Sequence, residues 1–172
     1  MSQHTRYVDS WAFILAFYVR LLCFFLVAFC HAGAAQTGGD VAIIVNQDVP
    51  VDNLSFAEVR KLLLGDRQFW NSGLRVTLLI RAPVARERDV VLKTIYQMTE
   101  AQFRQYWIAK VFRADVPAAP NIVYSNEMAV ELVQLLPGSI AFADAVQLPK
   151  QVKVKILKVD GYLPGEKGYP LR

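Results

Sequence analysis

Three arginines, Arg81, Arg86 and Arg88, lie within one stretch of eight residues. We expect Arg81 to end a buried strand, and Arg86 and Arg88 to fall in the first turn of the helix that follows. A guanidinium group is well shaped for two-point contact with a phosphate or a carboxylate. A helix N-terminus adds unpaired N–H groups and a partial positive charge. The spacing therefore predicts a binding site for a small inorganic or organic anion.

Two polar residues at other element ends are predicted to join this site. Asn46 follows the first strand of the chain, and Ser125 opens the last long helix. In open α/β sheets, ligands gather outside the carboxyl ends of the strands. There are two alternatives: Ser125 acts as an ordinary helix cap, and Glu87 and Asp89 neutralise the arginines to give a solvated, self-paired face.

The residues available after position 35 disfavour catalysis. Both cysteines and both histidines of the chain lie at or before residue 31. Without them there is no imidazole base, no thiolate nucleophile and no usual zinc ligand. We find no paired-carboxylate or nucleophile motif, so we expect neither an enzyme nor a bound cofactor or metal. The net charge of +4 is small, and the basic residues are interleaved with acidic ones. Both features disfavour nucleic acid as the partner.

The first 35 residues have the features of a secretory signal. Apolar runs at 11–19 and 21–30 are separated by Arg20, and small residues follow at 32–35. A basic start, a short apolar run and a small-residue site predict a signal peptide over 1–35, cleaved near Ala34 or Ala35. Residues 36–172 are then one periplasmic domain. An uncleaved membrane anchor over 11–30 is the alternative, but it would place Arg20 within the bilayer.

Strand-like and helix-like segments alternate through the predicted domain. Apolar runs predict strands at 41–45, 75–80, 122–124, 139–143 and 152–156. Helices are predicted at 55–64, 85–97, 99–112 and 125–136, the first and third opened by capping boxes. This alternation predicts an α/β fold with an open, mainly parallel sheet and helices on both faces. The run at 41–45 is of the kind buried on both faces, as in a parallel sheet.

Three collinear segments carry a family resemblance: 54–65 (LSFAEVRKLLLG), 137–142 (PGSIAF) and 168–171 (GYPL). With them, the chain resembles the phosphate-type periplasmic substrate-binding proteins of ABC importers, and more closely their short, exported, single-lobe relatives. The resemblance implies one lobe of a type II periplasmic binding protein. It also implies a phosphate-like ligand and, as partner, an ABC permease or a membrane sensor.

The chain departs from this family in two ways. It has the length of one lobe, whereas full-length members close two lobes on phosphate. Arg81 matches the family's arginine, but residues 82–85 (APVA) replace the Ser-Gly-Thr hydroxyls that follow it there. The sequence therefore keeps a second function open, that of a ligand-free interaction module docking on an envelope transporter or sensor. Trp70, Tyr106 and Trp107 are predicted to pack in the core or on the lobe surface, and the alternative is that they form part of such a partner face.

Overall fold

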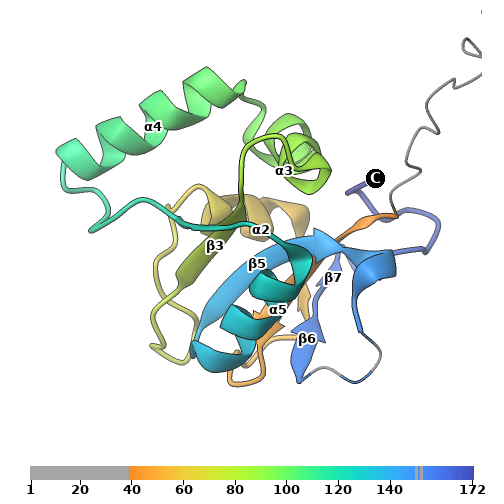
Figure 1. The fold of residues 1–172 in the computed structure, drawn as a ribbon. Helices are drawn as coiled ribbons and strands as arrows, with labels where there is room; N and C mark the ends of the chain where they lie inside the picture. The colour runs from red at the N-terminus through yellow and green to blue at the C-terminus, as the bar shows by residue number, and fades with distance from the viewer. Residues whose placement is uncertain (1–38, 150, 152) are drawn as a thin grey trace, which may run out of the picture. The chain divides into compact units, whose positions relative to one another are not determined.

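A five-stranded sheet forms the centre of the computed structural model, which describes residues 39–149, 151 and 153–172 (Figure 1). The predicted signal peptide lies outside these residues. The strand order is β4-β3-β5-β1-β6. The strands span Val41–Asn46 (β1), Thr77–Arg81 (β3), Asn121–Val123 (β4), Ser139–Asp144 (β5) and Val154–Ile156 (β6). A second sheet pairs β2 (Asn53–Leu54) with β7 (Lys158–Val159) in parallel.

Four of the five central strands run in one direction, and β1 runs against them. β3 is parallel to both β4 and β5, whereas β1 is antiparallel to both β5 and β6. The predicted α/β class with a mainly parallel sheet is confirmed. The parallel direction expected for the first strand is wrong. All six residues of β1 are buried because packed layers cover both of its faces, and not because its neighbours are parallel to it.

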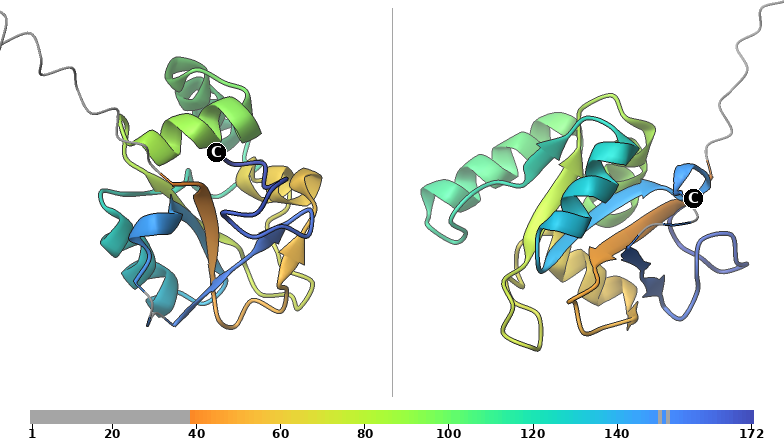
Figure 2. Two further views of the ribbon diagram at one scale, coloured as in Figure 1. Left: turned by 90° about the vertical axis from the view of Figure 1, so that its right-hand side faces the viewer. Right: turned by 60° about the horizontal axis from the view of Figure 1, so that its bottom comes forward.

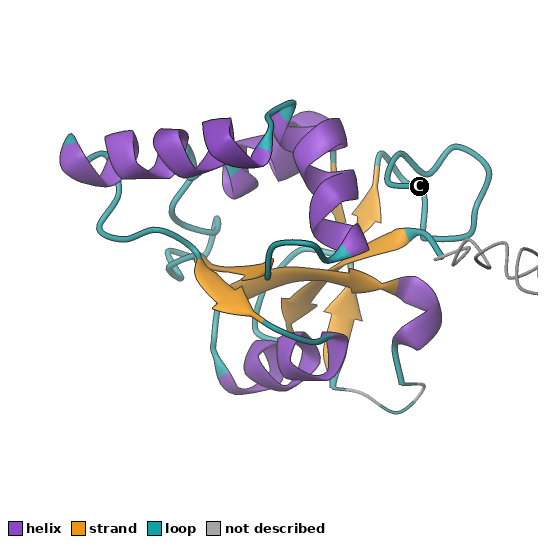
Figure 3. Ribbon diagram, turned by 45° about the horizontal axis from the view of Figure 1, so that its top comes forward, coloured by secondary structure: helices purple, strands orange, loops and turns teal. Residues whose placement is uncertain are grey.

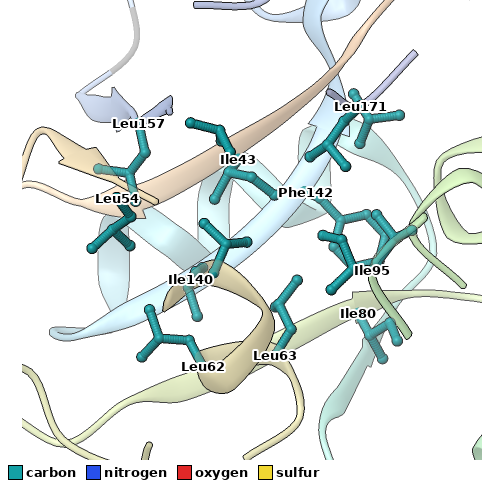
Figure 4. Close-up of a cluster of buried hydrophobic side chains, with 14 of the residues drawn as sticks. Ile43, Leu54, Leu62, Leu63, Ile80, Ile95, Ile140, Phe142, Leu157 and Leu171 are labelled. Atoms are coloured by element: carbon teal, nitrogen blue, oxygen red, sulfur yellow. The ribbon is translucent and has the colours of Figure 1, made fainter. Parts of the chain in front are cut away.

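Helices lie on both sides of the sheet, as predicted (Figure 3). α2 (Phe56–Leu63), α3 (Arg86–Val91), the π-helical η1 (Leu92–Tyr96) and α4 (Glu100–Phe112) all contribute to the larger apolar core. Ile43, Ile140 and Phe142 from the sheet pack there against Leu62, Leu63 and Ile95 (Figure 4). α5 (Asn126–Leu135) packs on the other face, over Ala42 and Ile44.

Both predicted capping boxes are present. The Glu58 N–H donates to Ser55 Oγ at 3.3 Å, and the Ser55 N–H donates to Glu58 Oε2 at 2.9 Å. Thr99 and Gln102 repeat the arrangement at the start of α4 with bonds of 2.8 and 3.3 Å. These bonds satisfy N–H groups that have no partner within the helix. They fix where α2 and α4 begin, and therefore which residues of each helix meet the core.

The C-terminal segment closes against the start of β1 (Figure 2). The Val41 N–H donates to the Leu171 carbonyl at 2.8 Å, and Tyr169 Oη donates to the Val41 carbonyl at 2.7 Å. The two ends of the described chain therefore hold each other in place. Within the described ranges, no helix combines the length and the apolar character needed to cross a membrane.

Candidate functional site

Arg81 ends β3 and is buried at the carboxyl edge of the sheet. It is 8% exposed, and its backbone pairs with Val123 of β4. Among the described residues, its buried Nε and Nη1 atoms have no hydrogen-bond partner. A buried donor without an acceptor costs about 1–3 kcal/mol. This guanidinium group would therefore gain free energy from any acceptor that reaches it.

Glu87 forms an ion pair with Arg81, and the charge of Arg81 also acts on Glu127. Glu87 Oε2 lies 3.7 Å from Arg81 Nε, with both side chains buried. That distance allows charge attraction but is too long for a hydrogen bond. The pKa of Glu127 is lowered by its own backbone N–H, by the Ser125 hydroxyl and, to a smaller extent, by the charge of Arg81. The charge of Arg81 thus reaches the first turn of α5, and an incoming anion would compete with Glu87, the carboxylate that pairs with Arg81.

Ser125 lies at the same edge as Arg81, two residues beyond the strand pair of Arg81 and Val123. Its Oγ accepts the N–H of Met128 at 3.1 Å and so caps α5. The predicted helix-cap role of Ser125 is confirmed. A contribution of Ser125 to anion binding stays a prediction.

Arg86 holds the start of the described chain against the sheet. Its Nη2 donates to the Gly39 carbonyl at 2.5 Å and lies 3.3 Å from Asp144 Oδ2. Asp144 ends β5 and is 3% exposed. An acidic residue 58 positions away in sequence therefore already pairs with Arg86, and the role of Arg86 as an anion ligand stays a prediction.

Arg88 is also committed within the fold. Its Nε and Nη2 donate to the two oxygens of Glu100 at 2.8 and 2.9 Å, and its Nη1 donates to the Arg81 carbonyl at 2.6 Å. Its guanidinium carbon lies 4.8 Å from the centre of the Phe103 ring. Arg88 is 3% exposed. It joins the end of β3 to the start of α4, and these contacts oppose its predicted role as a ligand, which stays a prediction.

Asn46 lies at the opposite end of the sheet from Arg81. Both strands pair with β5, so positions along β5 give a common scale. Asn46 follows the Val45–Ile140 pair and lies level with Ser139, whereas Arg81 lies three residues beyond the Leu78–Ile140 pair, in the opposite direction. The two levels differ by four residues, or about 13 Å along a strand. Asn46 instead donates through Nδ2 to the carbonyls of Val133 and Gln134. Its predicted place in the anion site is corrected, because β1 runs against β3.

The loop after β3 contains strained backbone. Val84 has φ 67° and is 98% exposed. A β-branched residue rarely adopts the left-handed region, which costs an ordinary residue roughly 1–2 kcal/mol. The helix that follows does not begin with a side-chain cap, because its N-cap residue is Ala85. This loop offers backbone groups to a ligand, but no hydroxyl group.

Within the described residues, no group of three or more His, Cys, Asp or Glu side chains is placed to hold a metal ion. Of the five predicted site residues, the structure brings Arg81 and Ser125 to one edge of the sheet. The buried Nε and Nη1 of Arg81 make no hydrogen bond there with any described residue. The structure assigns Arg86, Arg88 and Asn46 to contacts that hold the fold together.

Solved structures of phosphate-binding proteins contain the same fold. No family model and no curated protein matches this chain. An ABC-type phosphate transport receptor from Vibrio cholerae superposes with a TM-score of 0.57 at 18% identity, covering 73% of this chain and 48% of that one. PstS from Borrelia burgdorferi gives 0.55 at 19%, covering 73% and 49%. The phosphate binding protein from Stenotrophomonas maltophilia gives 0.51 at 14%, covering 74% and 40%.

The chain spans less than half the length of each of these proteins. At such identities the likeness concerns the fold, and it confirms the predicted architecture. The described residues therefore have a mixed α/β fold that resembles one lobe of the phosphate-binding proteins.

Proposed function

We propose that this chain is a solute-binding-like module that holds one small oxyanion, such as phosphate or sulfate, against Arg81. The observation that carries the proposal is the pair of buried Arg81 nitrogens without hydrogen-bond partners. The positive end of α5 lies at the same edge and favours an anion there. The fold likeness to phosphate receptors supports the same ligand class.

The proposed site differs from one that uses side-chain hydroxyls. Residues 82–85 supply no hydroxyl group, so the guanidinium group must provide most of the polar contact. Because Arg81 Nε and Nη1 are also shielded from water, we expect this side chain to turn outward when the anion binds. Glu87 opposes binding by attracting the same charge at 3.7 Å. We therefore expect Glu87→Gln to raise the affinity for the anion.

We further propose an exported module that works beside an envelope permease or sensor. The signal-like segment over 1–35 supports export, and the ABC transport receptor among the similar structures supports a permease as partner. The competing function is a ligand-free docking module. It predicts that no anion stabilises the chain and that crosslinking in intact cells still captures an envelope protein.

Thermal unfolding of the full chain tests the ligand. A ligand that binds the native state alone stabilises it by about 2.7 kcal/mol at 100 times its dissociation constant, or on the order of 10 °C for a chain of this size. Phosphate or sulfate should raise the unfolding midpoint of wild type. Arg81→Met should abolish this rise in the unfolding midpoint. The control variant Arg75→Met, which removes an exposed arginine ahead of the same strand, should keep it. The proposal fails if neither anion shifts the wild type, or if both variants respond as wild type does.

A further inference from the structure

A hollow of about 790 Å³ lies beside α4, away from the Arg81 nitrogens. α4 extends past the sheet, and the chain that follows it returns towards β4 (Figure 1). Residues of α4 line one part of the hollow. The returning segment 117–120, Ile80 of β3 and Ile122 of β4 line the rest. The hollow is therefore built from three separate stretches of the chain.

The lining is almost entirely apolar. Of its fifteen residues, twelve have apolar side chains, among them Phe103, Trp107, Ile108, Val111, Phe112 and Ile122. Phe112 is 91% exposed and Ile108 is 63% exposed. Contiguous apolar surface of this kind is unfavourable in water and marks a binding site.

One positive charge remains unpaired at the wall of the hollow. Arg88 and Glu100 line it, but they neutralise each other in a two-point ion pair. Arg104 also lines it and is exposed, and it makes no ion pair with any residue that the structure describes. The lining therefore combines a long apolar surface with a net charge of +1 at Arg104.

The size and polarity of the hollow favour a small amphipathic molecule over a peptide. Small-molecule sites commonly enclose about 300–1,000 Å³. An extended peptide would bury backbone groups against a wall in which Pro117 and Pro120 provide no N–H donor. A hydrocarbon chain carries no such groups.

We propose that this hollow binds a fatty acid of about twelve carbons, with the hydrocarbon chain against α4 and segment 117–120 and the carboxylate at Arg104. The uncharged alcohol of equal chain length should bind more weakly, because it lacks the ion pair. The proposal does not depend on Arg81, so Arg81→Met should bind the fatty acid as wild type does.

Equilibrium dialysis of the full chain with radiolabelled dodecanoate, with dodecanol for comparison, tests the proposal. Wild type should bind dodecanoate saturably. Ala119→Trp fills the hollow from an exposed position and should abolish this binding. Arg104→Gln should weaken dodecanoate binding by about 2- to 5-fold and leave dodecanol binding unchanged. Arg113→Gln removes an exposed charge that does not line the hollow and should change neither.

Three outcomes would overturn the proposal. The first is no saturable binding to wild type. The second is unchanged binding by an Ala119→Trp variant whose unfolding midpoint matches wild type, which would place the fatty acid elsewhere, for example on the apolar run 11–30. The third is a wild-type dimer in sedimentation equilibrium that Ala119→Trp converts to a monomer, since a second copy of the chain would then occupy the hollow.

Discussion

Replacing Glu100 by Gln tests whether Arg88 holds the fold together. The carboxylate accepts two hydrogen bonds from a guanidinium group that is 3% exposed. Hydrogen bonds to charged groups contribute about 1.5–3 kcal/mol each, which gives about 3–6 kcal/mol for the pair. Because the Glu100 side chain is 37% exposed, water replaces part of the hydrogen-bond energy that the substitution removes. We expect Glu100→Gln to lower the free energy of unfolding by about 2–4 kcal/mol.

Urea unfolding of the full chain, followed by circular dichroism, measures this free energy. Glu100 also lies in the first turn of α4, where a negative charge is favourable in its own right. A double-mutant cycle with Arg88→Met removes that contribution and isolates the pair. Asp115→Asn is the matched control, because Asp115 pairs with Arg113 while both side chains are about half exposed. Its cost should stay below about 1 kcal/mol.

A coupling energy below about 1 kcal/mol between Arg88 and Glu100 would refute this reasoning. Arg88 would then be a buried cation that the fold does not need, and its predicted role as an anion ligand would return. A coupling of about 2 kcal/mol or more, with unchanged phosphate binding in Glu100→Gln, would establish Arg88 as a structural residue.

Four further outcomes follow from the structure. Val84→Gly should raise the free energy of unfolding by about 0.5–1 kcal/mol, because relief of the left-handed strain exceeds the added chain entropy; a lowered urea midpoint would contradict this. Burial raises the pKa of Tyr169 from its ordinary value of 10.0, so the stability from its neutral phenol is complete below pH 10 and is lost as the pH rises above it. Tyr169→Phe should remove that component from an alkaline unfolding titration. Asn46→Ala should cost about 1–3 kcal/mol in urea without altering an anion-induced shift, since Asn46 lies at the opposite edge. Mass spectrometry of the exported chain should show loss of the residues up to Ala34 or Ala35, and an intact N-terminus would indicate an anchor instead.

Local sequence patterns predicted where most elements begin and end. The Ser55–Glu58 and Thr99–Gln102 boxes depend on bonds between residues three positions apart, so a single stretch of sequence contains all the information. Strand positions followed from runs of apolar residues, and all five central strands match within two residues at each end. The last 3 residues of the predicted 152–156 strand form β6. The π-helical turn after Val91 carries no comparable signal, because the same apolar spacing suits an α-helix.

Strand direction could not be predicted from the sequence. A continuous apolar run such as 41–45 indicates burial on both faces, but it is equally compatible with parallel and antiparallel neighbours. Placing β1 parallel to β3 would bring Asn46 to the same edge of the sheet as Arg81, with β5 between the two strands. The actual direction of β1 moves Asn46 by four residues along the sheet, onto the carbonyls at the end of α5. The misplacement of Asn46 thus follows from one wrong strand direction, and not from the chemistry assigned to Asn46.

The partners of the three arginines also depend on the fold rather than on sequence distance. Glu87, a neighbour in sequence, does lie beside Arg81, but Arg86 pairs with Asp144 and Arg88 pairs with Glu100. The last two acids are 58 and 12 residues from their partners, and no pattern in the first turn of α3 indicates them. Once they are placed, two of the three positive charges are used, and Arg81 keeps unsatisfied donors because its one close carboxylate stands at 3.7 Å. An anion that binds this edge must therefore outcompete Glu87 for a single guanidinium group, which is why Glu87→Gln and Arg81→Met should shift anion affinity in opposite directions.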